Sequence, residues 1–389
     1  MRIMRKKILF DVVASLIEEN KDKIISALCE IETIKTAILE VEKTINALRT
    51  YNREDVYLMK RKPLGRVAVF LPFNMPLYSL VLYAFGPAYV GNTVLVRPSK
   101  ITKSVLFQVV GYFSSLLEEL GIQLFDTSGK EFLNDILKVN KVDAIVFTGK
   151  YESVLDIKEK CHEVKLIYCG SGVCPVIVKE DADLKAAVSD ILYSKFFNSG
   201  QDCLATETVY VNRIIGNEFK KELLSQIKNI HVGVNDSIES DIGELMTLEQ
   251  AQRVIELIEQ YSDSNILKRG SVEGKYVEPV VIQTTMDDAN LHTEKFAPVL
   301  MVAFYTDENK VIEAINNSDN LLAMTVYGSR YSENTFSMDH VEYNRSVIAA
   351  ENEDAHIPFG GYRHSGFVAE SGRIIKEGPI LFSVETSTQ

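Results

Sequence analysis

Residues 66–97 read RVAVFLPFNMPLYSLVLYAFGPAYVGNTVLVR and carry the clearest indication of the fold. The first six residues are almost wholly apolar, which predicts a short buried strand. A loop with two prolines follows, and the apolar run 77–90 predicts a helix. A Gly-Asn pair then turns the chain into a second strand at 93–97. A strand, a helix and a strand in this order are typical of a parallel sheet.

The same alternation extends to both sides of this stretch. Residues 7–50 contain no Gly or Pro and repeat apolar residues at helical spacing, which predicts a helical layer. Further strands are expected at 122–125, 142–147, 175–178, 207–211, 276–282, 301–305, 323–327 and 346–350. Further helices are expected at about 102–120, 130–139, 217–229, 247–260 and 310–316. We therefore expect an α/β fold with a parallel sheet covered by helices on both faces.

The composition limits the functions that are open to the chain. At 389 residues it is long enough for two or three domains. Its net charge of −12 speaks against nucleic acid as a partner, because phosphates need a basic surface. No apolar run is long enough to span a membrane. The five cysteines form no CxxC pair, which predicts a reduced, cytoplasmic protein without a disulfide framework or metal site.

One cysteine, Cys203, ends the hexapeptide NSGQDC at 198–203. Gly200 allows a backbone conformation that is closed to residues with side chains, so Cys203 follows a sharp turn. A thiol held there is accessible to a substrate. Taken alone, the motif favours a small buried core residue over a nucleophile.

Several residues lie at the carboxyl ends of the expected strands. They are Asn74, Arg97, Ser99, Lys100, Thr148 and Gly149. Ligands of parallel sheets lie beyond the carboxyl ends of the strands, so these residues are candidates for a binding site. Asn74 lies between two prolines and either donates a hydrogen bond into a cleft or caps the following helix. The dinucleotide fingerprint G-x-G-x-x-G is absent.

Taken in order, six short motifs resemble those of the aldehyde dehydrogenase superfamily. They are Pro72–Pro76, the strand from Gly91 to Ser99, Phe147–Gly149, Asn198–Cys203, Glu294–Pro298 and Pro358–Gly361 followed by Ser365-Gly366. Each motif is weak alone, but six in the family's order are hard to obtain by chance.

The resemblance implies an aldehyde dehydrogenase-like fold with three parts. The first is a Rossmann-like cofactor domain with the N-terminal helices at 1–170, and the second is an α/β catalytic domain at 171–370. The third is a small β arm for oligomerisation, with one segment at about 51–62 and the rest at 371–389, including a strand at 380–385. A homodimer or homotetramer is expected from such an arm.

The resemblance also implies a thiol mechanism on a small aldehyde. Cys203 attacks the carbonyl carbon, while the Asn74 amide and the Cys203 backbone N–H hold the oxyanion. Hydride passes to NAD or NADP and leaves a thioester on Cys203. Glu294 matches the residue that holds the nicotinamide ribose, and Phe296 the residue beside the ring.

Two departures from the family pattern bear on function. The usual general base is a Glu, and Cys169 stands at its position. The family usually has an acidic residue that binds the adenosine ribose hydroxyls, and Lys100 stands at that position here. Arg97 replaces the lysine that the family usually has before the Pro-Ser pair. A cation there favours the 2′-phosphate of NADP or indicates weaker NAD binding.

Three hypotheses follow from these departures. In the first, the thioester passes to a thiol such as coenzyme A, or an acyl thioester is reduced in the reverse direction. In the second, water hydrolyses the thioester to a carboxylate. In the third, the chain is a non-catalytic binding or assembly subunit, although Asn74, Cys203, Glu294 and Phe296 are all present. We favour an enzyme, with a slight preference for the thiol acceptor.

Overall fold

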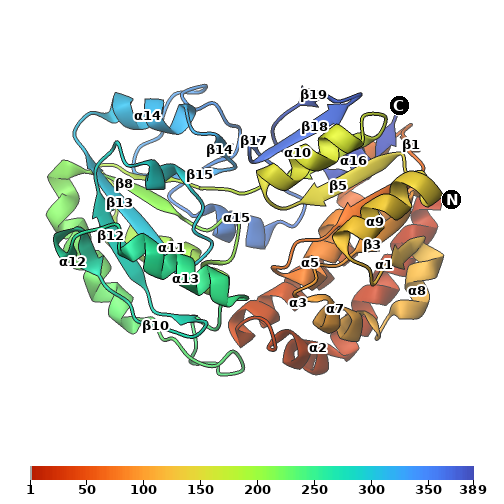
Figure 1. Cartoon of the computed structure of the whole chain (residues 1–389), viewed down its shortest axis with the longest axis horizontal. Coiled ribbons are helices and arrows are strands. Elements are labelled where there is room, and N and C mark those ends of the chain that lie inside the picture. The colour runs from red at the N-terminus through yellow and green to blue at the C-terminus, as the bar shows by residue number, and fades with distance from the viewer. Residues whose placement is uncertain (1) are drawn as a thin grey trace.

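The computed structural model describes residues 2–389, with side chains described from residue 4; Met1, in the expected first domain, lies outside the described residues. Within these residues the strands form two seven-stranded sheets and three two-stranded sheets. Each large sheet and its helices form one lobe, and the two lobes lie side by side (Figure 1). The first lobe contains the sheet built from 66–169 and 366–376, and the second lobe contains the sheet built from 176–343.

The first sheet has the order β19-β18-β6-β5-β2-β3-β4. Its strands are β2 (Arg66–Phe70), β3 (Thr93–Arg97), β4 (Ile122–Leu124), β5 (Ala144–Thr148), β6 (Lys165–Cys169), β18 (Gly366–Glu370) and β19 (Arg373–Lys376). The strands from β6 to β4 run parallel, which confirms the expected parallel sheet. β18 and β19 add an antiparallel edge that the sequence patterns did not predict.

The strands of this sheet bury both faces. Val67 and Val69 pack against the N-terminal helices, whereas Ala68 and Phe70 pack against the opposite layer. Side chains alternate between the faces of a strand, so an almost continuous apolar run is what a doubly covered sheet requires.

Helices cover both faces of the first sheet. One layer contains α1 (Arg2–Glu19), α2 (Lys21–Leu28), α3 (Ile34–Thr50), α4 (Asp55–Leu58), α5 (Pro76–Leu80), α6 (Gly86–Val90), α7 (Lys103–Val110) and α8 (Ser114–Leu120). The other contains α9 (Gly129–Asp135) and α10 (Tyr151–Lys160). The expected helical layer at 7–50 is therefore three helices, and Thr33 caps the third through its side chain.

The second sheet has the order β16-β15-β7-β8-β13-β12-β9. Its strands are β7 (Val176–Val178), β8 (Thr208–Asn212), β9 (Ile266–Lys268), β12 (Val280–Thr284), β13 (Val299–Tyr305), β15 (Met324–Tyr327) and β16 (Val341–Tyr343). Its helices are α11 (Leu184–Phe196), α12 (Gly216–Gln226), α13 (Leu248–Ile258) and α14 (Glu308–Asn316). Only the edge strand β9 runs antiparallel within the described sheet.

The strand expected at 346–350 is wrong, because these residues open the helix α15 (Val347–Glu353). The Ser346 hydroxyl accepts a hydrogen bond from the Ala349 backbone N–H at 3.3 Å. A capping serine followed by alanines and glutamates favours a helix, and this outweighs the strand preference of two β-branched residues.

The strand expected at 380–385 is also wrong. Phe382–Glu385 form the short helix α16, Ile380 makes an isolated antiparallel bridge with Phe359, and β20 (Ser387–Thr388) is extended. β20 pairs with β1 (Lys62–Pro63) of the same chain, so the ends of the expected arm contact each other. The remaining short pairs are β10 (Val272–Glu273) with β11 (Tyr276–Val277) and β14 (Asn320–Leu321) with β17 (Tyr362–Arg363).

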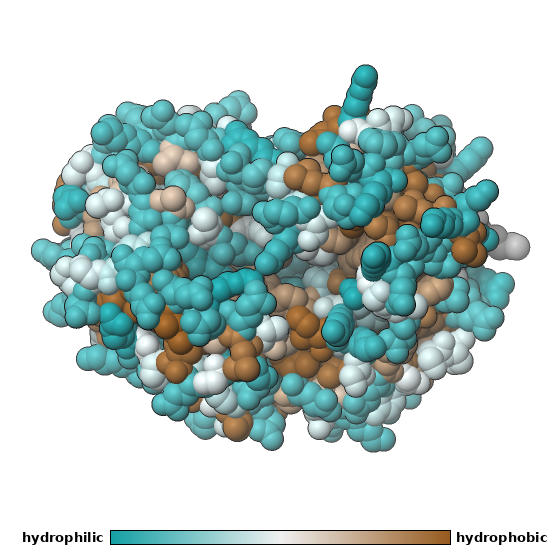
Figure 2. Space-filling view, in the orientation of Figure 1, coloured by the Kyte–Doolittle hydropathy of each residue, from teal (hydrophilic) through white to brown (hydrophobic). Residues whose placement is uncertain are grey.

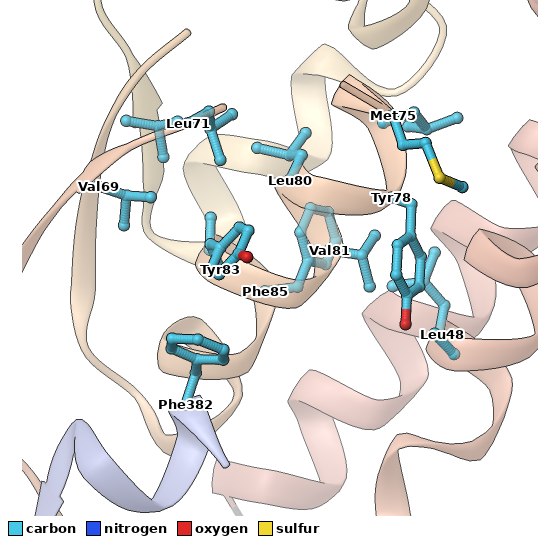
Figure 3. Close-up of a cluster of buried hydrophobic side chains, with 14 of the residues drawn as sticks. Leu48, Val69, Leu71, Met75, Tyr78, Leu80, Val81, Tyr83, Phe85 and Phe382 are labelled. Carbon is cyan, nitrogen blue, oxygen red and sulfur yellow. The ribbon is translucent and has the colours of Figure 1, made fainter. Parts of the chain in front are cut away.

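Phe382 of α16 anchors the C-terminus in the core of the first lobe. Its ring lies edge-on to Tyr83, with centroids 4.8 Å apart, and Figure 3 shows it pointing into the cluster around α5. Packing of this bulky ring explains why the chain forms a helical turn here. Within residues 2–389 no helix is long and apolar enough to cross a bilayer.

Candidate active site

The turn that carries Cys203 lies at the end of α11. Asn198, Ser199 and Gly200 adopt consecutive left-handed conformations with φ of 47°, 57° and 74°. Such conformations are uncommon outside glycine and need support. The Ser199 hydroxyl supplies part of it by accepting the Gly243 backbone N–H at 2.9 Å. This turn presents Cys203 as a half-buried residue outside regular structure, as the sequence predicts.

The segment 294–298 packs directly against this turn. A Cβ added to Gly200 would lie 2.5 Å from the Ala297 carbonyl oxygen, so only glycine fits there. Phe296 also has a left-handed backbone, with φ of 51°. The nucleophile turn and the 294–298 segment are therefore fixed against each other.

The Asn74 loop meets the same segment. The ring of Phe73 lies edge-on to Phe296, with centroids 5.4 Å apart. The side-chain amide of Asn74 makes no hydrogen bond within the described residues, whereas its carbonyl oxygen accepts from the Ser79 hydroxyl at 3.1 Å. The structure thus brings the loops of Asn74 and Cys203 to the same 294–298 segment.

The alternative role of Asn74 as a helix cap is wrong. Met75 occupies the N-cap of α5 with a left-handed backbone and makes no side-chain capping bond. The buried carboxylate of Glu40 accepts the Tyr78 backbone N–H at 2.8 Å instead. A backbone N–H in the first turn of α5 is therefore bound by Glu40 of α3, and the Asn74 side chain does not cap the helix.

The Cys203 thiol is surrounded by acidic groups. Burial raises its pKa well above the usual range, and the charges of Asp202 and Glu294 raise it further. Burial also raises the pKa of Asp202 to about 6. A second thiol, Cys174, donates to the Cys203 carbonyl oxygen at 3.4 Å. The thiol is therefore protonated at neutral pH until a base takes its proton.

Cys169 ends β6 inside the first sheet. It pairs with Thr148 of β5 on one side and with Gly366 of β18 on the other. Its exposed fraction is 1%, and burial raises its pKa to about 12. A thiol of this kind cannot take a proton from water at neutral pH.

Glu294 is a second carboxylate of the site, besides Asp202, whose pKa is raised. Its Oε1 accepts the Gly172 backbone N–H at 3.1 Å, which connects the 294–298 segment to the turn after Cys169. Burial and then the charge of Glu207 raise its pKa to about 7. A group with such a pKa can exchange protons at neutral pH.

The candidate cofactor residues lie at the carboxyl edge of the first sheet. β2 pairs with both β3 and β5, so Arg97 and Phe147 lie in register beside Phe70. Ser99 and Lys100 follow Arg97, and Thr148 and Gly149 follow Phe147. Ser99 accepts the Ile101 backbone N–H through its hydroxyl at 3.4 Å, and Lys100 is exposed. The structure therefore places these residues along one edge of the sheet.

Arg97 faces the start of α9. Its Nε donates to the Thr127 carbonyl oxygen at 3.4 Å, and burial lowers its pKa. Gly149 has φ of 154° and its carbonyl oxygen accepts from the Tyr168 hydroxyl at 3.0 Å. Cationic side chains at the carboxyl edge of a parallel sheet are suited to binding the phosphates of a dinucleotide.

Sequence reasoning missed an ion pair near the site. Lys195 and Glu207 lie 3.1 Å apart, and neither side chain is exposed. A single lysine in the apolar stretch 191–197 was the available signal, since unpaired lysines are almost never fully buried. The partner could not be read from the sequence.

The two lobes leave a hollow at the surface between them (Figure 2). Two cavities border the N-terminal helices instead, with volumes of about 640 Å³ and 330 Å³. Cys203 lines neither of them, while Phe197 and Asn198 line the smaller one. Within residues 2–389 no group of three or more His, Cys, Asp or Glu side chains is arranged to hold a metal ion.

Comparison with known sequences gives a family match and several relatives. The model of the aldehyde dehydrogenase family matches residues 1–377. Lactaldehyde dehydrogenase of Methanococcus aeolicus is 28% identical over 384 residues, which is 92% of this chain and 82% of the relative. 3-Sulfolactaldehyde dehydrogenase of Priestia megaterium is 28% identical over 338 residues, or 84% of this chain and 68% of the relative.

Solved structures share the fold at lower identity. Glyceraldehyde-3-phosphate dehydrogenase GapN of Methanocaldococcus jannaschii, complexed with NADP, has a TM-score of 0.87 at 23% identity and covers 99% of this chain and 88% of its own. Succinic semialdehyde dehydrogenase of Streptococcus pyogenes, in complex with NADP⁺, has a TM-score of 0.86 at 20% identity, with 100% and 89% covered.

Proposed function

The chain belongs to the aldehyde dehydrogenase family and is an NAD(P)-dependent aldehyde dehydrogenase, and we propose that Cys203 is its nucleophile. The observation that carries this proposal is the meeting of three segments. The Asn74 loop and the Cys203 turn both contact 294–298, through the Phe73–Phe296 ring pair and the Gly200–Ala297 contact. An intact arrangement of this kind gives no support to a non-catalytic subunit.

Cys203 forms a bond from Sγ to the aldehyde carbon. The carbonyl oxygen becomes an oxyanion, which the Asn74 side-chain N–H and the Cys203 backbone N–H stabilise. Because the Cys203 pKa is raised, a base has to take the thiol proton, and Glu294 with a pKa of about 7 is suited to it. The nicotinamide of the bound nucleotide supplies the hydride acceptor, and loss of hydride leaves a thioester on Cys203.

The carboxyl edge of the first sheet holds the nucleotide in this proposal. Arg97, Ser99 and Lys100 bind its adenosine end, and Thr148 and Gly149 border the phosphates. Glu294 and Phe296 contact the nicotinamide end. Lys100 stands where a carboxylate would repel a 2′-phosphate, so we expect NADP to bind at least as well as NAD.

A thiol such as coenzyme A takes the acyl group from Cys203 in the release step that we favour. Cys169, with a pKa of about 12, cannot activate water. A thiol acceptor needs less help, because it is partly ionised near neutral pH and strongly nucleophilic. The reverse reaction would reduce an acyl thioester to an aldehyde.

Hydrolysis is the second candidate, and the pKa of Glu294 favours it. A carboxylate with a pKa of about 7 takes a proton from water far more readily than one with an ordinary pKa. The names of two relatives also suggest a substrate class, since lactaldehyde and 3-sulfolactaldehyde are both 2-hydroxyaldehydes. We propose a small aldehyde of this class as the first substrate to test.

A panel of acceptors and cofactors tests the function. Lactaldehyde, 3-sulfolactaldehyde and succinic semialdehyde are each offered with NAD or NADP, with and without coenzyme A, while nucleotide reduction is followed by absorbance. Reduction with one aldehyde that coenzyme A accelerates supports the favoured release step. Fast turnover in water that coenzyme A leaves unchanged supports hydrolysis, and no reduction with any aldehyde contradicts the proposal.

We also propose that copies of this chain assemble as a homodimer or homotetramer, with the first lobe binding the cofactor and the second lobe carrying the nucleophile. The β1–β20 pair forms a two-stranded sheet of its own, so its outer edges have no strand partner within the described residues. Exposed edges of this kind favour pairing. Light scattering across a range of concentrations tests the assembly, and a constant monomer mass contradicts it.

A further inference from the structure

The buried ion pair Lys195–Glu207 encloses the nucleophile turn. Lys195 lies near the end of α11, and Glu207 stands directly before β8. Lys195 precedes Cys203 by eight residues, and Glu207 follows it by four. Their contact at 3.1 Å therefore joins the two ends of the segment that presents the thiol.

A second contact lies beside this pair. The Ser194 hydroxyl accepts from the backbone N–H and the hydroxyl of Thr206, at 3.3 Å and 3.0 Å. Two adjacent connections thus tie the end of α11 to the start of β8, one neutral and one charged. The neutral one already closes the turn, so the charged one calls for a separate explanation.

Glu207 also holds the segment on the far side of the nucleophile turn. Its Oε1 accepts the Phe296 backbone N–H at 3.2 Å. The Phe296 carbonyl oxygen accepts from the Gln250 side-chain amide at 3.4 Å. Both polar groups of a residue in a left-handed conformation are therefore held by buried side chains.

Stability alone does not account for the charges. Lys195 Nζ contacts Glu207 through Oε1, and neither Lys195 Nζ nor Glu207 Oε2 has a hydrogen-bond partner among the described residues. Removing two charges from water costs free energy that one ion pair with few hydrogen bonds does not recover, and apolar residues at such sites are often equally stabilising. A buried pair with so few partners indicates a role in function.

We propose that Lys195 and Glu207 are positioning residues that hold the nucleophile turn and the Glu294–Phe296 segment in fixed relation. The inference rests on the proposed roles of Cys203 and Glu294. Glu207 reaches both segments at once, through Lys195 on one side and the Phe296 amide on the other. Lys195 holds Glu207 in place through the ion pair, so that the site retains its geometry when a substrate enters.

The pair also acts on Glu294 through its charges. The negative charge of Glu207 raises the pKa of Glu294, and the positive charge of Lys195 lowers it. The other titratable groups with electrostatic contact to Glu294 are Tyr168, Cys174, Cys203 and Lys295. Lys195 and Glu207 contact each other and bear opposite charges. Removing one or the other charge should therefore shift the pKa of Glu294 in opposite directions.

The experiment measures the dissociation constant of NADP between pH 5.5 and 8.5 for the wild type, Glu207→Gln and Lys195→Met. The part of the pH dependence that Glu294→Gln abolishes is assigned to Glu294. Glu207→Gln removes a negative charge and should move the midpoint of the Glu294 titration to lower pH. Lys195→Met removes a positive charge and should move that midpoint to higher pH. Loosened packing would move both variants in one direction, and that result overturns the proposal, as does an unchanged midpoint.

A control comes from a largely buried ion pair in the first lobe. Lys165 and Glu385 lie 3.1 Å apart, far from Cys203 in sequence. Lys165→Met should leave the midpoint unchanged. With aldehyde present, Glu207→Gln should lower kcat by up to about 100-fold while KM for NADP changes less, because a misplacement of ~1 Å can cost that much.

A measurement without nucleotide separates this inference from the proposed function. Hydrogen exchange is followed by mass spectrometry on peptides covering 291–300, for the wild type and for Lys195→Met/Glu207→Leu, which fills the site with apolar groups. Exchange there should become roughly 2- to 10-fold faster, as expected for the loss of one hydrogen bond. Unchanged exchange overturns the positioning role, whereas absent NADP binding by the wild type contradicts the proposed function alone.

Discussion

The thiols of Cys169 and Cys203 differ more in the backbone conformation around them than in their acidity. Cys169 closes a strand in the middle of the first sheet, in register between Thr148 and Gly366. Cys203 follows three left-handed residues and lies outside any strand or helix. Burial raises the pKa of both. We therefore expect the turn that presents Cys203, and not an increased acidity, to distinguish the proposed nucleophile from Cys169.

The largest expected effect removes the presented thiol. Cys203→Ala should abolish nucleotide reduction with any aldehyde, since the neighbouring thiols of Cys169 and Cys174 are both buried. NADP binding, measured by titration, should persist. Cys169→Ala is the matched control and should retain the pre-steady-state burst of reduced nucleotide. A burst from Cys203→Ala would show that the two thiols have been assigned the wrong way round.

The oxyanion donor comes next in size. Asn74→Ala should lower kcat by about 100- to 1000-fold, the usual loss for one such donor. Ser79→Ala removes a hydrogen bond to the Asn74 carbonyl oxygen but keeps the amide, and it should cost far less. Steady-state kinetics of both variants make the comparison. Equal losses would mean that the loop, and not the amide, is what matters.

Restoring a carboxylate at the buried thiol sharpens the contrast between the two regions. Cys169→Glu should increase thioester hydrolysis by about 100-fold, at the lower end of the contribution of a general base. Turnover after the burst, measured without added thiol, reports it. The control is the same measurement with coenzyme A, which should change little. No gain in water would indicate that position 169 cannot reach the acyl group.

The pH dependence follows from Glu294. A base acts in its ionised form, so the burst rate should rise as the pH rises through about 7, where Glu294 loses its proton. Glu294→Gln should flatten this rise. Stopped-flow absorbance between pH 5.5 and 8.5 measures it. A rise that survives the substitution would assign the proton to another group.

The smallest effect concerns the nucleotide. Lys100→Glu should weaken NADP binding relative to NAD by about fivefold, since one exposed charge contributes at most ~1 kcal/mol. Lys103→Glu offers a control, because Lys103 already pairs with Asp126 at 2.5 Å on the same surface. Titration of both nucleotides decides the outcome. Equal effects of the two substitutions would indicate that the overall surface charge, and not a specific contact of Lys100 with the nucleotide, determines the preference.

The sequence predicted the parallel sheet and the Cys203 turn because both depend on local patterns. Apolar runs of strand length, a Gly-Asn turn and Gly200 each act within a few residues. The helix at 347–353 was missed because a single capping serine outweighed two β-branched residues. The return of 366–376 to the first sheet was missed because β6, its partner, lies far away along the chain.

The site shows the same division. Asn74, Cys203 and Glu294 were proposed from short motifs, but the contacts between the segments that carry them were not predicted. The Phe73–Phe296 ring pair and the Lys195–Glu207 ion pair join residues distant in sequence. Protonation was likewise beyond reach, because the pKa of about 7 for Glu294 arises from burial and from Glu207, which only the fold brings near.

The placement of β18 and β19 has a consequence for how the protein is made. On the ribosome the first lobe emerges first, yet its sheet lacks two strands until residues 366–376 have left the exit tunnel. During that time β6 presents an unpaired apolar edge, the kind of surface that associates with other nascent chains. Synthesis of the entire second lobe has to finish before this edge is covered. A stop codon between β16 and β18 would therefore release a chain prone to aggregation, even though both halves of the active site had been translated.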